Sequence, residues 1–183
     1  MKDLEYFANL IKNFKSVYLA GGIQARHRQN WRDDLQSFFE KNKIKVYNPV
    51  EDNSNIFNPS VMGYKDDGSS YTLEELQDID ELKEALVLRQ TELNDKHFIK
   101  NSDLVIFYLD ETAGFGTKTE FKWCYDEFKK PIIIVRNIPR RKISHWIKWR
   151  RFFYLILDKK AIEFKNFGEV KEFFKYYFNF KDE

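Results

Sequence analysis

Short apolar runs alternate with amphipathic segments along this chain, and the alternation predicts strands that are followed by helices. Apolar residues recur three or four positions apart from Leu4 to Phe14 and again from Trp31 to Phe39, which is the spacing of one helix face. Strands are predicted at residues 16–20, 44–48, 103–109, 132–135 and 152–157. A strand, a helix and a second strand therefore follow one another over residues 16–48, an order typical of a parallel βαβ unit.

The remaining segments fit the same α/β organisation. Further helices are predicted at residues 72–86, around 93–99, at 117–129 and at 167–178. Residues 50–70 differ, because Asn, Asp, Ser, Gly and Pro dominate there and indicate a long loop. The chain has 183 residues and no internal repeat, so residues 1–183 are expected to form a single domain.

The composition of the chain argues against several classes of protein. Hydrophobic residues make up 43% of the chain and aromatic residues 17%, which argues against intrinsic disorder. The 31 Lys and Arg residues nearly balance 29 Asp and Glu residues, so a dedicated nucleic-acid binder is not expected. The single Cys124 excludes an internal disulfide framework and fits a reducing compartment. Neither a signal peptide nor an apolar run of roughly 20 residues is found, so we expect a cytoplasmic protein without a membrane partner.

The segment from Gly114 to Glu120 carries the first candidate chemistry, because it follows the apolar run 103–109. Ligands of open α/β sheets bind beside the carboxyl ends of strands, and Gly114 and Gly116 would let a ligand approach the backbone closely. We expect Thr117 to open a helix and to place Glu120 in its first turn, where the helix dipole favours an ionised carboxylate. Glu120 could then attack a sugar carbon as a nucleophile. The same Thr-x-x-Glu spacing also fits a purely structural capping box, and both interpretations stay open.

Three further positions each have a structural and a functional interpretation. The turn Gly21-Gly22 after Tyr18 is either a tight turn or a ligand-binding turn, and Tyr18 points either into that site or into the core. Asp95 is either the N-cap of a short helix or a carboxylate that binds a sugar hydroxyl or a base. Trp31 is expected in the core, whereas Arg32 at the next helical position could reach a substrate.

The segment 136–151 contains seven Lys and Arg residues and no acidic residue, with His and Trp interleaved. Such a segment could bind a phosphate or a single-stranded nucleic acid. It also fits an amphipathic surface helix, and the balanced total charge favours this solvated-face interpretation. The His and Cys residues lack metal-ligand spacing and no Gly-x-Ser-x-Gly elbow is present, so neither metal-dependent nor serine hydrolysis is expected.

Taken together, the motifs resemble the nucleoside 2-deoxyribosyltransferase superfamily, and the Trp-Arg pair and the Gly-Phe-Gly-Thr turn resemble its divergent branch. The resemblance extends over roughly residues 16–136. It rests on Val17-Tyr18-Leu19-Ala20-Gly21-Gly22, Trp31-Arg32, Val46-Tyr47-Asn48-Pro49, Asp95, Ser102-Asp103-Leu104-Val105-Ile106-Phe107, Gly116-Thr117 through Glu120-Phe121, and Lys130-Pro131-Ile132.

The resemblance implies a flavodoxin-like (Rossmann-like) three-layer α/β fold with a parallel sheet of about five strands and an extra C-terminal helical segment. It also implies cleavage of the bond between a base and a deoxyribose, with Glu120 as the nucleophile, Tyr18 orienting Glu120 and Asp95 helping to hold the substrate. The implied substrate-binding residues are Gly21, Gly22, Arg32, Gly114, Gly116 and Thr117. No metal or other cofactor is implied, and relatives are often homo-oligomers in which a neighbour completes the pocket.

Three functional hypotheses follow, all with a small nucleoside or nucleotide as the partner. The first is an enzyme that transfers deoxyribose between bases through a covalent glycosyl-Glu120 intermediate. The second is a hydrolase of deoxynucleoside 5′-monophosphates, in which an arginine such as Arg32 or Arg136 grips the phosphate. The third is a nucleotide-binding module without catalytic activity.

Overall fold

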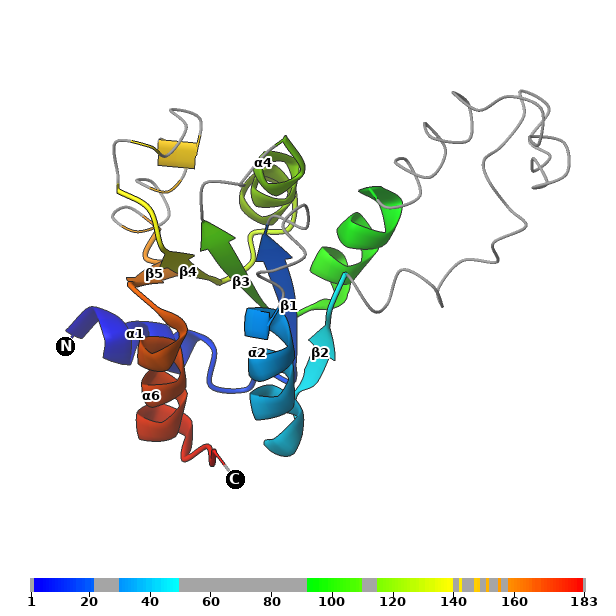
Figure 1. Ribbon diagram of the computed structural model, residues 1–183. Coiled ribbons are helices and arrows are strands. Elements are labelled where there is room, and N and C mark those ends of the chain that lie inside the picture. Colours follow the sequence, from blue (N-terminus) through cyan, green and yellow to red (C-terminus); the bar gives the residue numbers. More distant parts are fainter. Residues whose placement is uncertain are drawn as a thin grey trace, which may run out of the picture.

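The computed structural model of the protein describes residues 2–21, 30–49, 92–109, 115–139, 142, 147–148, 151, 155 and 158–182. Its centre is a five-stranded sheet with the order β2-β1-β3-β4-β5, in which every neighbouring pair of strands is parallel (Figure 1). The strands are β1 (Ser16–Gly21), β2 (Lys45–Tyr47), β3 (Leu104–Leu109), β4 (Ile132–Arg136) and β5 (Ala161–Phe164).

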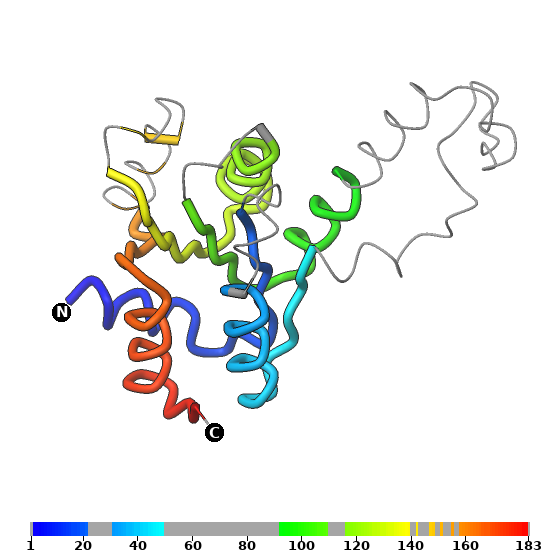
Figure 2. Tube along the Cα trace, viewed as in Figure 1, coloured from blue at the N-terminus to red at the C-terminus, as the bar shows by residue number. Residues whose placement is uncertain are grey.

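Helices cover both faces of the sheet, as the chain trace also shows (Figure 2). One face carries α1 (Lys2–Leu10), α2 (Asn30–Lys41) and α6 (Phe167–Phe178). The other face carries the helix at residues 92–101 and α4 (Phe115–Lys122), which continues directly into the π-helix η4 (Trp123–Glu127). The predicted three-layer, flavodoxin-like α/β fold with a C-terminal helix is thereby confirmed. Among the described residues, no helix combines the length and the apolar character that a membrane span requires.

The central strands are apolar on both sides because helices cover both sides. Every residue of β1 and of β3 is buried, as is typical of parallel strands inside a doubly covered sheet. Successive side chains point to opposite faces, so Val17 and Leu19 pack with α1, α2 and α6, whereas Tyr18 and Ala20 pack with the helix at 92–101 and with α4. Tyr18 therefore faces the layer that contains Glu120.

The connections place a topological switch point beside β1. The chain leaves β1 through α2 and returns in β2 on one side, whereas it leaves β3 through α4 and returns in β4 on the other side. Because parallel crossovers are right-handed, these opposite directions put α2 and α4 on opposite faces of the sheet. Ligands of such sheets bind in the crevice between the two diverging connections, which here lies at the carboxyl ends of β1 and β3.

Some predicted boundaries differ from the structure. The fifth strand is Ala161–Phe164, which the sequence pattern did not predict, and the strand predicted at 152–157 lies outside the described residues apart from Leu155. The helix predicted to open at Thr117 already begins at Phe115. The loop predicted at 50–70 and the helix predicted at 72–86 lie outside the described residues.

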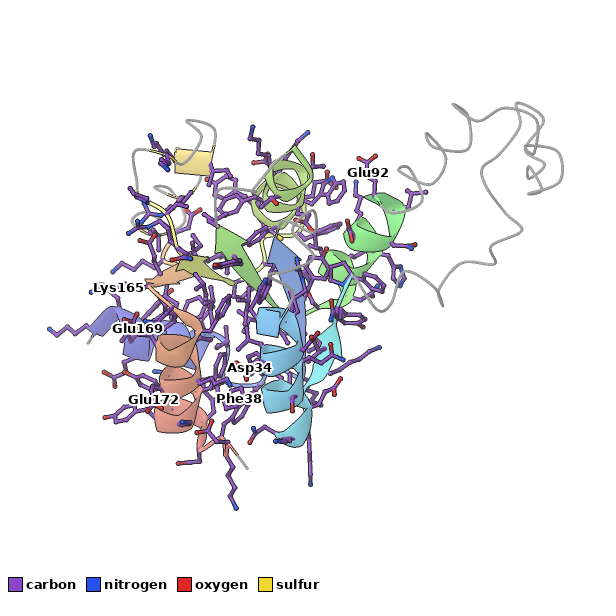
Figure 3. The ribbon with its side chains drawn as sticks, viewed as in Figure 1. Asp34, Phe38, Glu92, Lys165, Glu169 and Glu172 are labelled. Carbon is purple, nitrogen blue, oxygen red and sulfur yellow. The ribbon has the colours of Figure 1, made fainter. Side chains whose placement is uncertain are left out.

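The C-terminal helix has a well-formed start. Asn166 caps α6, because its side-chain oxygen accepts a hydrogen bond from the backbone nitrogen of Glu169 at 2.9 Å. The carboxylate of Glu169 accepts in turn from the backbone nitrogen of Lys165 at 2.8 Å. Both residues are labelled in Figure 3, near the start of α6. One unsatisfied donor of the first helical turn, the Glu169 nitrogen, thus gains a partner, and so does the backbone nitrogen of Lys165 just before the cap.

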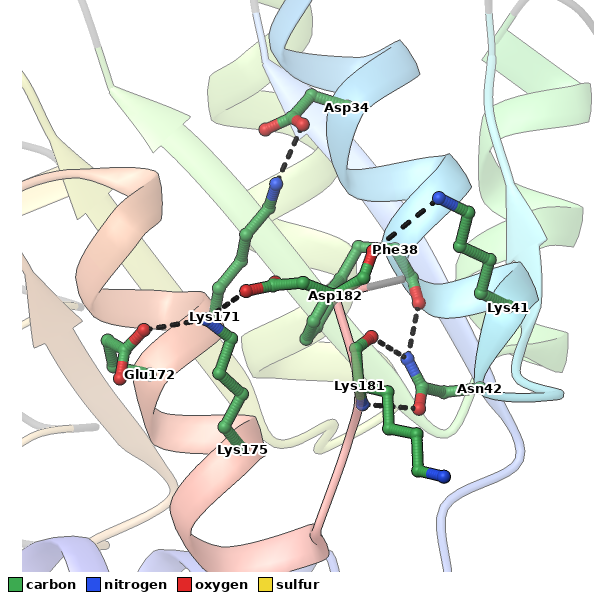
Figure 4. A network of polar contacts seen from close by, with 9 residues as sticks. All are labelled: Asp34, Phe38, Lys41, Asn42, Lys171, Glu172, Lys175, Lys181 and Asp182. Atoms are coloured by element: carbon green, nitrogen blue, oxygen red, sulfur yellow. Dashed lines mark hydrogen bonds and ion pairs between the residues drawn. The ribbon is translucent and has the colours of Figure 1, made fainter.

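Polar contacts also join α6 and the residues that follow it to α2 (Figure 4). Lys171 of α6 pairs with Asp34 of α2 at 2.7 Å. The side chain of Asn42 donates to the carbonyl oxygen of Lys181 at 3.0 Å and accepts from its backbone nitrogen at 2.9 Å. These contacts hold α6 and α2 together as one layer.

Candidate active site

A buried tyrosine of β1 and a buried glutamate of α4 meet on one face of the sheet. The hydroxyl of Tyr18 donates to Oε1 of Glu120 across 2.6 Å. Tyr18 is 0% exposed and Glu120 is 5% exposed. The ring of Tyr18 stacks on Phe98 of the helix at residues 92–101, with ring centroids 6.3 Å apart. The tyrosine thus fixes the position of one carboxylate oxygen inside the protein.

Glu120 is not part of a capping box. Because α4 begins at Phe115, Thr117 is already helical and Glu120 lies in the second turn. The Glu120 carboxylate bonds to a side chain of β1 instead of reaching back to the start of its own helix. The structural interpretation from the sequence is therefore wrong, and the carboxylate belongs to a tertiary contact.

Asp95 comes from the other helix of the same layer. It lies inside the helix at residues 92–101, so the N-cap interpretation is wrong. Its Oδ1 is buried and has no hydrogen-bond partner among the described residues. Buried acceptors nearly always have a donor, so this oxygen can accept a hydrogen bond from a bound molecule. The charge of Asp95 raises the pKa of both Tyr18 and Glu120, which shows that the three groups form one electrostatic cluster.

Burial governs the acidity of this cluster. Burial is the largest cause of the raised pKa of Glu120, which is about 8, and the charge of Asp95 raises this pKa further. The hydrogen bond from Tyr18 and the charge of Arg32 lower this pKa. Burial also raises the pKa of Asp95 to about 6, against the lowering effects of Tyr18 and Arg32, and Glu92 in the same helix raises it further (Figure 3). The sequence analysis expected the helix dipole to favour an ionised Glu120, whereas burial of its carboxyl opposes ionisation.

Arg32 reaches the carboxyl end of β1 from α2, in the opposite layer. Its side chain is 1% exposed, and its Nη2 donates to the carbonyl oxygen of Gly21 at 2.8 Å. Its Nε donates to the carbonyl oxygen of Leu19 at 3.4 Å, and its Cζ lies 4.4 Å from the ring centroid of Trp31. Trp31 lies in the core as predicted, and it also supports the guanidinium of Arg32.

The glycines that the sequence analysis predicted to bind substrate lie in different surroundings. Gly21 ends β1 with φ +155°, and a Cβ there would lie 3.1 Å from the carbonyl oxygen of Tyr108, so the position needs glycine. Gly116 lies in α4, and a Cβ there would meet no atom within 4 Å. Thr117 is buried in α4. Gly22 and Gly114 lie outside the described residues, so their predicted binding role stays a prediction.

A second polar cluster lies where β4 and β5 run side by side. Glu163 of β5 accepts from Nε of Arg136 at 3.0 Å and also pairs with Arg151. Nη1 of Arg136 donates to the carbonyl oxygen of Ile138. Arg136 and Arg151, both from the basic segment 136–151, thus form ion pairs with an acidic residue of the protein itself.

The sequence analysis missed Phe98 as a support of the site. Its ring packs against Tyr18 and also against Tyr47 of β2, with centroids 5.4 Å apart in the second pair. The available signal was its position one helical turn after Asp95, which puts both residues on one helix face. Within the described segments, no group of three or more His, Cys, Asp and Glu residues is arranged to hold a metal ion.

Comparison with solved structures identifies the fold. The chain is similar to the CMP N-glycosidase BcmB from Clostridium botulinum, with 19% identity and a TM-score of 0.50 over 86% of this chain and 96% of that chain. It is also similar to a 2-deoxyribosyltransferase from Bacillus psychrosaccharolyticus, with 16% identity and a TM-score of 0.46 over 85% and 90% of the two chains. No protein-family model matches the sequence, and no curated protein matches it significantly. The first likeness confirms the fold that the sequence resemblance implies.

Proposed function

We propose that the protein is an enzyme that cleaves the N-glycosidic bond of a deoxynucleoside and transfers the sugar to another base. The observation that carries this proposal is the 2.6 Å hydrogen bond from Tyr18 to the buried Glu120, beside the unpartnered Oδ1 of Asp95. Tyr18 belongs to β1, one of the two strands beside the topological switch point, and ligands of such sheets bind near that point. The resemblance of the sequence to nucleoside 2-deoxyribosyltransferases assigns the same three residues to the chemistry.

In the first step, the ionised Glu120 attacks the anomeric carbon of the deoxyribose. Tyr18 holds Oε1, so Oε2 forms the new C–O bond while the bond from the anomeric carbon to the base nitrogen breaks. The bonding electrons leave with the base, and Asp95 donates a proton to it. In the resting enzyme this proton lies on Glu120, whose pKa is about 8, rather than on Asp95, whose pKa is about 6, so it moves from Glu120 to Asp95 before the attack. The product is a glycosyl ester of Glu120 and a neutral free base.

In the second step, another base attacks the anomeric carbon of the ester. It gives its proton to Asp95, and Glu120 leaves as a carboxylate, so both residues return to the states that they had just before the attack. Attack by water in place of the base would yield free deoxyribose and make the enzyme a hydrolase. Transfer therefore requires that the second base reaches the ester before water does.

Hydrolysis of a deoxynucleoside 5′-monophosphate is the second candidate. It needs an arginine for the phosphate, and the sequence analysis named Arg32 and Arg136. Both bind groups of the protein itself: Arg32 donates to Gly21, and Arg136 pairs with Glu163. Among the described residues, neither of these two arginines is therefore given over to a phosphate, and transfer between bases is kept as the first candidate.

The first experiment incubates the protein with deoxyinosine and free adenine and separates the products by chromatography. Deoxyadenosine is expected with the wild-type protein. It should be absent with Glu120→Gln, which keeps the size of the side chain but removes the nucleophile. Glu172→Gln is the matched control, because this glutamate is 72% exposed on α6 in the opposite layer.

The possible outcomes separate the candidate functions. Hypoxanthine without deoxyadenosine would contradict transfer and support hydrolysis. Release of a base from deoxynucleoside monophosphates alone would support the second candidate. Nucleotide binding without turnover of any of these substrates would mean that the protein is a binding module.

A further inference from the structure

The helix at residues 92–101, which carries Asp95, ends against the side chain of Lys130. Nζ of Lys130 donates to the carbonyl oxygen of Lys100 at 2.8 Å and to that of Ser102 at 2.7 Å. Carbonyl groups at the end of a helix have no partner within the helix, and a cation there also meets the negative end of the helix dipole. Lys130 therefore caps this helix from a different part of the chain.

Lys130 is also bonded to the segment that carries Glu120. Its backbone nitrogen donates to the carbonyl oxygen of Cys124 at 3.0 Å, and Cys124 belongs to η4, the direct continuation of α4. The next residue, Pro131, accepts from the backbone nitrogen of Val105 in β3 at 3.1 Å. One residue thus connects the helix of the acid, the helical segment of the nucleophile and, through its neighbour, the sheet.

Other polar contacts of the 92–101 helix are weaker. Lys96 pairs with Glu127 of η4 at 2.7 Å, but their side chains are 40% and 37% exposed, so water screens the pair. The hydroxyl of Ser16 donates to the carbonyl oxygen of Asn101 across 3.4 Å, which is long for a hydrogen bond. Lys130 is half-buried, and burial lowers the pKa of its amino group, so its two short bonds are screened less.

The position of Asp95 follows the position of the helix end. Phe98 and Ile99 are each 0% exposed and hold the helix against the core, but apolar contacts have no direction and resist sliding only weakly. Hydrogen bonds are directional and do resist it. A helix rises about 1.5 Å per residue, so Lys100 lies about 7.5 Å along the axis from Asp95, and a shift of one moves the other.

We propose that Lys130 is a positioning residue of the site, which holds the helix of Asp95 against the segment of Glu120 through the carbonyl oxygens of Lys100 and Ser102. Lys130 acts through the helix and does not touch the reacting atoms. Its effect on turnover rests on the proposed function, in which Asp95 delivers the proton. Its hold on the helix does not depend on that function.

Hydrogen exchange of Lys130→Met tests the hold on the helix. Methionine keeps most of the apolar stem and removes the amino group. Backbone amides within residues 92–101 should exchange about tenfold faster or more, while those of α2 should not change. Lys122→Met is the matched control, because this lysine of α4 is exposed and its loss should leave both helices unchanged. Unchanged exchange in Lys130→Met, or an equal acceleration in α2, would overturn the inference.

Turnover tests whether the hold serves Asp95. Below the unfolding transition, Lys130→Met should lower kcat for deoxynucleoside cleavage about 10- to 100-fold, since a misplacement of about 1 Å can cost that much. In an Asp95→Asn background the same substitution should change kcat little, because the group that Lys130 positions is already gone. An equal loss in both backgrounds would show a general structural effect and would overturn the inference.

The remaining outcomes also decide the question. If Lys130→Met does not fold, Lys130→Gln replaces it in both measurements, with the same expectations. Faster exchange in residues 92–101 with unchanged kcat would mean that the helix is held but that its position does not limit catalysis, which contradicts a positioning role. A wild-type protein without activity would refute the proposed function, whereas hydrogen exchange would still test the hold of Lys130 on the helix.

Discussion

At the residue scale, the groups around the end of β1 act on Glu120 in opposite directions. Burial and the charge of Asp95 oppose its ionisation, whereas the Tyr18 hydroxyl and the charge of Arg32 favour it. The ionised fraction of Glu120 at neutral pH therefore depends on single hydrogen bonds and charges.

Tyr18→Phe tests the hydrogen bond to Glu120. The substitution keeps the ring that packs against Phe98 but removes the donor to Oε1. A hydrogen bond to a charged group is worth about 1.5–3 kcal/mol, so kcat/KM near neutral pH should fall about 10- to 100-fold. Because the hydroxyl lowers the pKa of Glu120, the acid limb of the pH profile should also move upward. Unchanged steady-state kinetics over the pH range would contradict a role for this contact.

The residue types of the site were predictable from the sequence, but their ionisation was not. Tyr18, Glu120, Asp95 and Arg32 were named from motif and resemblance. In the structure Tyr18 donates a hydrogen bond to Glu120, and the charges of Asp95 and Arg32 act on the pKa of Glu120. Burial of Glu120 results from packing between β1 and α4, which are far apart in the sequence. Local pattern therefore indicated an ionised carboxylate at a helix start, whereas the three-dimensional packing makes it a weak acid.

At the element scale, the end of β1 depends on the absence of a side chain at Gly21. Gly21→Ala would place a Cβ 3.1 Å from the carbonyl oxygen of Tyr108 on backbone with φ +155°. We expect a loss of about 1–3 kcal/mol in the free energy of unfolding by chemical denaturation. Gly116→Ala is the control, because a Cβ in α4 meets no atom within 4 Å and alanine favours a helix by up to about 1 kcal/mol. Equal effects of the two substitutions would contradict this explanation.

Loss of the cap at the start of α6 is expected to change the stability of the protein but not its activity. Asn166→Ala removes the side-chain oxygen that accepts from the backbone nitrogen of Glu169. Loss of such a cap costs about 1 kcal/mol, which thermal unfolding can measure. Turnover below the unfolding transition should not change, because α6 lies on the face opposite α4. A change in kcat at unchanged stability would show that the two layers are coupled more closely than their packing indicates.

Most elements were predictable, and the exceptions have local causes. β1, α2, β3 and β4 follow apolar patterns that packing on both faces of the sheet requires. β5 has only four residues and includes Glu163, which pairs with two arginines, so its sequence lacks a continuous apolar run. η4 was predicted as ordinary α-helix, because its hydrogen bond from the Phe128 nitrogen to the Trp123 carbonyl depends on chain geometry rather than on residue type.

At the scale of the whole molecule, the buried Glu120 makes stability depend on pH. The pKa of Glu120 is raised in the folded protein to about 8 from an ordinary value of 4.5, so the folded state binds more protons than the unfolded state between these values. Stability should therefore fall as the pH rises through this window. Glu120→Gln should raise the melting temperature at pH 8.5 and change it little at pH 4.5. A wild-type melting temperature that rises from pH 5 to pH 8, with the same slope in Glu120→Gln, would contradict this.

The π-helix that follows Glu120 also has an evolutionary consequence. A turn closed by a hydrogen bond five residues back holds one residue more than an α-helical turn. Deleting one residue within Trp123–Glu127 would allow an uninterrupted α-helix to form, while Glu120, which lies before the turn, would keep its place against Tyr18. A homologous chain that is one residue shorter at this turn is therefore expected to continue α4 as ordinary α-helix without moving Glu120.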